Sequence, residues 1–142
     1  MESARAWMHT GLVRYEGHKM SKSRGNLVKV SQALQMAPAA AVRLYLVSHR
    51  YNRDWSFEWK GLIRNARFIE TMRKFLADDA RFDRGGDKPK PDPRLLKELA
   101  AALADDLDTP RAVRALRAAV RQKDAAAVRA MKDVLLGTAA LS

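Results

Sequence analysis

Helix-breaking residues are concentrated in one short segment, which divides the helix-forming part of this chain in two. Residues 83–93 contain two adjacent glycines and three of the five prolines in the sequence, separated by charged residues. Proline lacks a backbone donor and glycine is poorly restrained, so no helix continues through this segment. We therefore expect a flexible, solvated joint at 83–93.

Apolar residues recur at helical spacing on both sides of this joint. Before it, the pattern predicts a helix after Pro38 and a long helix over 58–76. After it, three start signals predict three helices that end near residues 107, 122 and 136: Asp92-Pro93, Thr109-Pro110 and Asp124. Alanine supplies much of the 47% apolar fraction, which favours closely packed helices over a wide sheet. The predicted fold is mainly α, a bundle of about four or five helices.

The first 36 residues predict a small β-containing or irregular segment. Residues 11–15 are β-inclined and meet the turn signal Glu16-Gly17, and residues 27–30 predict a second short strand. Ser31 is the expected N-cap of a brief helix through Met36. Residues 1–9 are interpreted as the end of a helix, and 51–56 as a loop. The expected organisation is a loop-bearing segment (1–36), a helical region (37–82), the joint (83–93) and C-terminal helices (94–142).

The run Lys19-Met20-Ser21-Lys22-Ser23, followed by Arg24-Gly25-Asn26, is the strongest candidate site. It combines two lysines with hydroxyl side chains and a glycine, which together indicate a mobile, positively charged loop. Such a loop suits a polyphosphate, because lysine can follow a phosphate as a point charge while backbone N–H groups approach closely.

Bulk composition excludes several classes of protein. The absence of cysteine excludes disulfides and thiolate metal sites. No apolar run approaches the roughly 20 residues that a membrane helix needs, and the N-terminus lacks a signal-peptide pattern, so we expect a cytoplasmic protein without a membrane partner. The net charge of +11 is spread along the chain. It fits an anionic partner such as nucleic acid, or an arginine-rich composition with solvated surfaces.

Several stretches together resemble the cysteinyl-tRNA synthetase family, which are class I aminoacyl-tRNA synthetases with a KMSKS loop, and its relative, the cysteine ligase of mycothiol synthesis. The first is Trp7–Gly11 ahead of Gly17–Ser23 and Gly25-Asn26. The others are Ala40–Leu46, Ser48–Tyr51, Asp54-Trp55-Ser56 with Trp59, and Asp105–Pro110. The resemblance covers residues 3 to about 137.

The resemblance implies roles for the lysine loop. Lys22 would contact the ATP phosphates while the amino acid attacks the α-phosphorus, and Lys19 would assist, so these two are the candidate catalytic residues. Ser21 and Ser23 would set the shape of the loop, and the backbone near His18 and Met20 would lie against adenine. Residues 18–23 are thus the candidate ATP-binding site, with ATP and magnesium as the implied cofactor.

The resemblance also shows what this sequence lacks. The family binds ATP and amino acid on a Rossmann-type sheet and selects cysteine with zinc, and neither the sheet nor the cysteines are present. We therefore expect the C-terminal half of such an enzyme, related to cysteine activation and tRNA aminoacylation, which binds no cofactor alone and needs a separate Rossmann half. The alternatives are a stand-alone tRNA- or RNA-binding module, or a regulatory paralogue that dimerises or pairs with the full-length synthetase.

Other candidate residues have two interpretations each. Four arginines on one side of a predicted helix, Arg111, Arg114, Arg117 and Arg121, could contact RNA phosphates or form a solvated face. Trp55, Phe57 and Trp59 could stack on bases or pack the loop against the long helix. His9 and His18 are weak zinc candidates, His49 fits a core position, and Asp105, Asp106 and Asp108 fit a helix start better than a magnesium site. No metal site is predicted.

Overall fold

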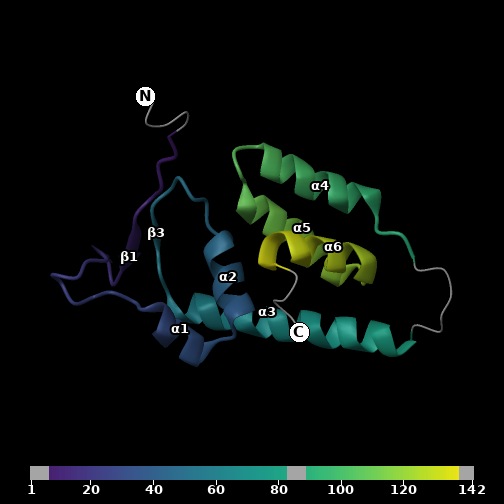
Figure 1. Cartoon of the computed structure of the whole chain (residues 1–142), viewed down its shortest axis with the longest axis horizontal. Coiled ribbons are helices and arrows are strands. Elements are labelled where there is room, and N and C mark those ends of the chain that lie inside the picture. The colour runs from purple at the N-terminus through teal and green to yellow at the C-terminus, as the bar shows by residue number, and fades with distance from the viewer. Residues whose placement is uncertain (1–6, 83–88, 138–142) are drawn as a thin grey trace, which may run out of the picture.

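Helices dominate the computed structural model, which describes residues 7–82 and 89–137 (Figure 1). The helices are α1 (Val30–Met36), α2 (Ala39–Val47), α3 (Trp59–Phe82), α4 (Pro93–Ala104), α5 (Thr109–Arg121) and α6 (Ala125–Leu136). The strands are β1 (Val13–Tyr15), β2 (His18–Lys19) and β3 (Trp55–Ser56). The sheet order is β2-β1-β3, with β1 antiparallel to β2 and parallel to β3. The mainly α prediction, a helical bundle with a small β segment, is confirmed.

Aspartate side chains start the last three helices. The carboxylates of Asp92, Asp108 and Asp124 each accept a hydrogen bond from a first-turn N–H group, at 2.8, 3.1 and 2.8 Å. Each cap satisfies a backbone donor that has no partner within its helix. Asp124 also accepts from the backbone N–H of Asp92 at 2.7 Å, so one side chain ties the start of α4 to the start of α6.

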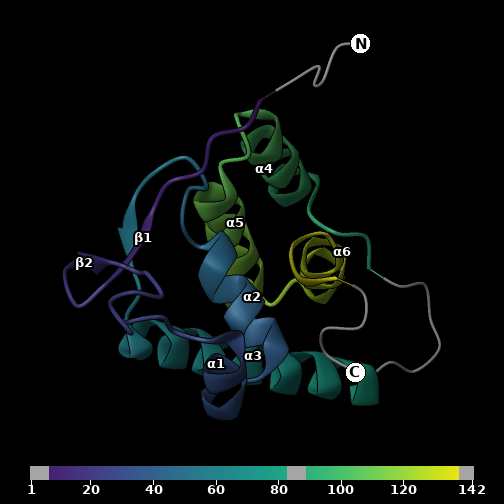
Figure 2. The ribbon, with the colours of Figure 1, turned by 60° about the vertical axis from the view of Figure 1, so that its left-hand side comes forward.

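The short helix α2 lies at the centre of the bundle and packs against α3, α5 and α6 (Figure 2). The largest fully buried side chains come from four helices: Leu44, Leu62, Ile69, Met72, Leu116, Val128 and Met131. One hydrophobic core joins the helices before and after the predicted joint, since residues from α1 through α6 contribute to it. No helix in the described ranges is both long and apolar enough to cross a membrane.

The strand prediction at 27–30 is wrong. Glu16 and Gly17 both have positive φ (52° and 77°), the backbone of a tight two-residue turn. This turn returns the chain at once, so residues 18–19 pair with β1 and residues 26–29 remain irregular. Accordingly Lys29, and not Ser31, is the N-cap of α1.

Other differences are small. The predicted loop at 51–56 contains β3, and the long helix continues six residues past Leu76, to Phe82. Residues 7–10 are irregular and exposed, so no helix ends at residue 9. Of the remaining expectations there, residues 1–6 lie outside the described part of the chain, as do residues 83–88 of the predicted joint.

Candidate nucleotide-loop site

The lysine loop extends from a hairpin at one edge of the molecule. Its first lysine ends β2, where Lys19 pairs with Arg14 and His18 with Tyr15. The next residue stays attached to the sheet, because the Met20 N–H donates to the carbonyl of Val13 at 3.2 Å. The loop then turns over residues 22–25, closed by the Gly25 N–H donating to the Lys22 carbonyl at 3.1 Å. Gly25 has a φ of 68°, a conformation that glycine adopts without strain.

The Asn26 side chain holds the two ends of this loop together. Its Oδ1 accepts from the Ser21 N–H at 3.0 Å, and its Nδ2 donates to the Lys19 carbonyl at 3.3 Å. The Ser21 and Ser23 hydroxyls lie 3.3 Å apart across the loop. The motif alone does not assign Asn26 this role, although an amide directly after the loop glycine is the local signal for such a bridge.

Both lysines of the loop are available to an anion. The side chains of Lys19, Lys22 and Ser23 are exposed. Within residues 7–82 and 89–137, no carboxylate lies within ion-pair distance of either lysine. His18 is likewise exposed on β2.

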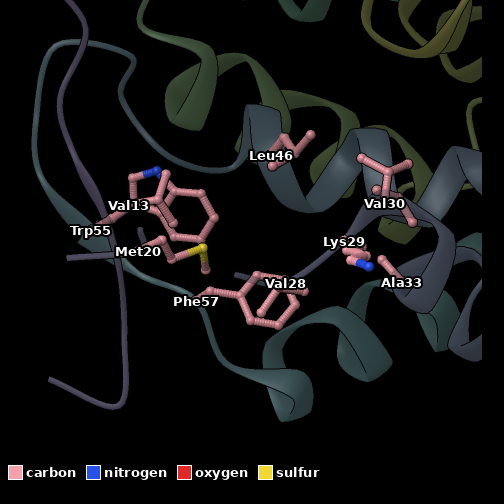
Figure 3. A pocket seen from close by; sticks show the side chains of 10 residues that line it. Val13, Met20, Val28, Lys29, Val30, Ala33, Leu46, Trp55 and Phe57 are labelled. Carbon is pink, nitrogen blue, oxygen red and sulfur yellow. The ribbon is translucent and has the colours of Figure 1, made fainter. Parts of the chain in front are cut away.

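Met20 points the other way and anchors the loop. Its side chain lines an open apolar cavity of about 180 Å³, to which the sheet and helices α1 and α2 contribute residues (Figure 3). The cavity is also lined by Val13, Val28, Lys29, Val30, Ala33, Val42, Leu46, Trp55 and Phe57. The alternation of exposed lysines with a half-buried methionine explains why a hydrophobic residue stands inside a charged motif.

The segment 51–57 supports the hairpin from below. The Gly11 N–H donates to the Tyr51 carbonyl at 2.7 Å, and a Cβ on Gly11 would lie 2.2 Å from the backbone of Arg53. The Asp54 carboxylate accepts from the Leu12 N–H at 2.8 Å. Only glycine allows so close an approach of two backbones. Sequence reasoning did not assign Gly11 or Asp54 a role, because the contact joins residues about forty positions apart.

Three aromatic side chains after Asp54 pack against the bundle, which confirms that interpretation over base stacking. Trp55 and Phe57 make edge-to-face contacts with Tyr45, at 5.5 and 5.4 Å, and Phe57 makes another with Trp59 at 4.9 Å. The Trp59 Nε1–H donates to the Tyr15 hydroxyl at 3.2 Å. The ring of His49 stacks on Trp55 at 3.9 Å; it was expected at a core position and is partly buried.

The acidic run before α5 is structural. Asp106 accepts from the Tyr51 hydroxyl at 2.6 Å and from the Asn52 amide at 3.0 Å. Asp108, which is buried, pairs with Arg50 at 2.6 Å. Hydrogen bonds and the Arg50 charge lower the pKa of Asp108 against the opposing effect of burial, which is the largest single influence. These contacts fasten the turn between α4 and α5 to the same segment that carries Asp54.

The four arginines of α5 differ in their surroundings. Arg111 makes two hydrogen bonds to Glu98, at 2.7 and 3.0 Å. Arg117 is half-buried, lies over the ring of Phe68 at 4.2 Å and donates to Asn65 at 2.9 Å. Arg114 and Arg121 are exposed. The structure thus leaves two of the four predicted RNA-contact residues accessible.

Comparison with known proteins gives a consistent result. Residues 1–67 match the family described as the tRNA synthetases class I (C) catalytic domain. The chain is 40% identical over 141 residues to the L-cysteine:1D-myo-inositol 2-amino-2-deoxy-alpha-D-glucopyranoside ligase of Thermobispora bispora, covering 96% of this chain and 33% of the ligase. It is 43% identical over 113 residues to the ligase of that name from Cellulomonas flavigena, covering 79% of this chain and 25% of the ligase.

A solved structure shows the same fold. The Agrobacterium radiobacter K84 agnB2 LeuRS, in a ternary complex with tRNA and LeuAMS, superposes with a TM-score of 0.74 at 19% identity. The match covers 92% of this chain and 20% of that one. The chain is therefore a class I aminoacyl-tRNA synthetase-like protein. Within that class it is related to the cysteine ligases, and it spans about a third or less of the length of the curated relatives it matches.

Proposed function

We propose that this chain supplies the ATP-phosphate loop and the supporting helical region of a cysteine-activating ligase. The observation that carries the proposal is that Lys19 and Lys22 are exposed, with no carboxylate partner in the described ranges, on a loop that Asn26 and Met20 hold in place. Lys22 would neutralise charge on the phosphates as pyrophosphate leaves, and Lys19 would assist it. ATP with magnesium would be the substrate pair, and residues 18–23 would contact it.

The amino acid and the remainder of the ATP would be bound by a Rossmann-type half, which we propose as the partner of this chain. An exposed apolar rim beside the loop supports that partner. Val30 and Leu46 line the cavity beneath Met20 and are 66 and 50% exposed. Exposed apolar residues that cluster in this way mark a surface for another protein segment. An acceptor of the amino sugar-inositol type is proposed from the ligases that the chain is similar to.

The test is a chimera in which this chain replaces the matching third of the Thermobispora bispora ligase, assayed by cysteine-dependent ATP–pyrophosphate exchange. We expect no exchange from the chain alone and measurable exchange from the chimera. Lys22→Ala should then lower the exchange rate by about 100-fold or more, the usual cost of removing one preorganised charge-stabilising group. Lys60→Ala, at an exposed position on α3, is the matched control and should change little. Robust exchange by the isolated chain, or full activity of the Lys22→Ala chimera, would contradict the proposal.

Two alternative functions have observations in their favour. A stand-alone tRNA- or RNA-binding module is favoured by the net charge of +11 and the exposed Arg114 and Arg121. A dimerising or regulatory paralogue is favoured by Trp7, Met8 and Leu12, which are 80, 63 and 40% exposed ahead of β1. Native mass spectrometry separates the second alternative, because a dominant monomer would contradict it.

A further inference from the structure

The side chain of Asp54 binds Leu12, directly before β1, and Arg14, within β1, with its two carboxylate oxygens. Oδ1 accepts from the Leu12 backbone N–H at 2.8 Å, and Oδ2 accepts from the Arg14 guanidinium at 2.9 Å. These two hydrogen bonds, the backbone one first, lower the pKa of Asp54, so it is ionised near neutral pH. Arg14 and Asp54 both remain nearly half exposed, so hydrophobic burial does not account for their arrangement.

Arg14 stands directly opposite Lys19 in the register of the hairpin. Paired residues of antiparallel strands point to the same face, so two positive side chains are neighbours at the entrance of the lysine loop. Like charges in this position repel each other, unless one of them is neutralised. The carboxylate of Asp54 lies on Arg14 and not on Lys19. Of these two cations, Asp54 therefore pairs with Arg14, which lies outside the loop.

The backbone contacts around Asp54 fix the hairpin in the same place. The Trp55 N–H donates to the Leu12 carbonyl at 3.1 Å, and the Phe57 N–H donates to the Arg14 carbonyl at 2.7 Å. The hydrogen bond from the Met20 N–H to the Val13 carbonyl joins the start of the loop to the strand that these contacts fix. We therefore expect a change in the contacts between Asp54 and β1 to alter the position of Met20, three residues beyond the turn.

We propose that Asp54 is a positioning residue that withholds Arg14 from the phosphate-binding loop, so that Lys19 and Lys22 alone meet the triphosphate. The inference rests on the proposed function, because it assigns the loop a polyphosphate ligand. Without the Asp54 charge, Arg14 would be free to turn toward an anion held at Lys19. The anion would then bind more tightly, but it would be displaced from the position in which Lys22 contacts it.

The test uses the full chain and inorganic tripolyphosphate, titrated calorimetrically at low salt. Asp54→Asn keeps an acceptor for the Leu12 N–H and removes the charge. We expect it to tighten tripolyphosphate binding about two- to fivefold, the range of an exposed ion pair. In an Arg14→Ala background the same substitution should have little effect. Glu16→Gln, which removes an equal charge from the turn of the same hairpin, is the matched control and should tighten binding less.

A purely structural role for Asp54 predicts the opposite result, since a disordered hairpin would bind the anion more weakly. Unchanged or weaker binding by Asp54→Asn would overturn the inference, as would equal tightening in the Arg14→Ala background. In the active chimera, the same variant should lower both the KM for ATP and kcat. A fall in kcat with an unchanged or raised KM would also count against it.

Amide hydrogen exchange separates this inference from the proposed function. Asp54→Ala should speed exchange at Met20, whose own acceptor is untouched, while amides of α5 and α6 stay as protected as before. Unchanged exchange at Met20 would refute the positioning role, whatever the loop binds. Tripolyphosphate binding that Lys22→Ala leaves intact would instead refute the proposed function.

Discussion

His49 connects the aromatic cluster to the helical bundle through three groups. Its ring stacks on Trp55 with an interplanar angle of 13°, and its Nδ1–H donates to the Tyr45 carbonyl at 2.9 Å. Its own carbonyl accepts from the Thr109 hydroxyl at 3.2 Å. Burial lowers the pKa of His49, against the weaker opposing effect of the Tyr45 and Leu46 carbonyls. The folded protein therefore favours the neutral imidazole.

This preference predicts a pH dependence of stability. The unfolded chain takes up a proton at His49 as pH falls below about 6.5, while the folded protein resists it, so the free energy of unfolding should fall between pH 7 and pH 5. Above pH 7 His49 is neutral in both the folded and the unfolded state, so it no longer contributes to the pH dependence of the free energy of unfolding. His49→Gln should lose this dependence, which urea denaturation at the two pH values would measure. An unchanged slope in His49→Gln would show that another group titrates.

Gly61 lies in the first turn of α3, where glycine is a poor helix former. A Cβ at this position would stand 2.7 Å from Cε2 of Tyr45. That ring cannot move aside easily, because it is 5% exposed and its hydroxyl accepts from the Glu58 N–H at 2.8 Å. The close packing of the helix on Tyr45 therefore explains why the weaker helix former is present.

Gly61→Ala should consequently destabilise the protein. Helix propensity would favour alanine by up to about 1 kcal/mol, but overpacking a buried ring costs about 1–3 kcal/mol. The expected net effect is a loss of stability, measured by denaturant titration. Ala77→Gly at an exposed site of the same helix gives the propensity term alone. In a Tyr45→Leu background the added methyl has room, and Gly61→Ala should then cost less. If Gly61→Ala stabilised the protein in the wild-type background, the Tyr45 ring would have to move aside at little cost.

The elements that sequence predicted correctly are those with local causes. Asp92 and Asp124 were recognised as caps because a cap is made within three residues of the helix start. The strands were predicted poorly because β1 pairs with β3 across about forty residues, and strands of two or three residues carry little periodicity. The site divides in the same way. The loop itself was evident from its residues, whereas the roles of Asp54 and Gly11 depend on a contact that only the fold creates.

Charge at the scale of the whole molecule is likewise redistributed by folding. The sequence offers four arginines on one side of α5, but Glu98 pairs with Arg111 and the Phe68 ring covers Arg117. Burial lowers the pKa of Arg117. Of these four arginines, Arg114 and Arg121 are the two that remain exposed to an RNA backbone, although the net charge is +11.

This count predicts how tRNA binding should respond to salt and to mutation. Each phosphate contact contributes a slope of about −0.9 to the dependence of log K on log salt, so losing two contacts should flatten it by about 2. The double variant Arg114→Glu, Arg121→Glu should therefore weaken binding and flatten the salt dependence, as measured by fluorescence anisotropy at several salt concentrations. Lys22→Ala should leave tRNA binding nearly unchanged, because the ligand that we propose for its loop is the triphosphate. Arg94→Glu with Lys97→Glu, a matched reversal on exposed positions of α4, should have the smaller effect. If the two reversals act equally, the overall charge and not the α5 face attracts the RNA. If Lys22→Ala is the most harmful change, the loop itself contacts RNA.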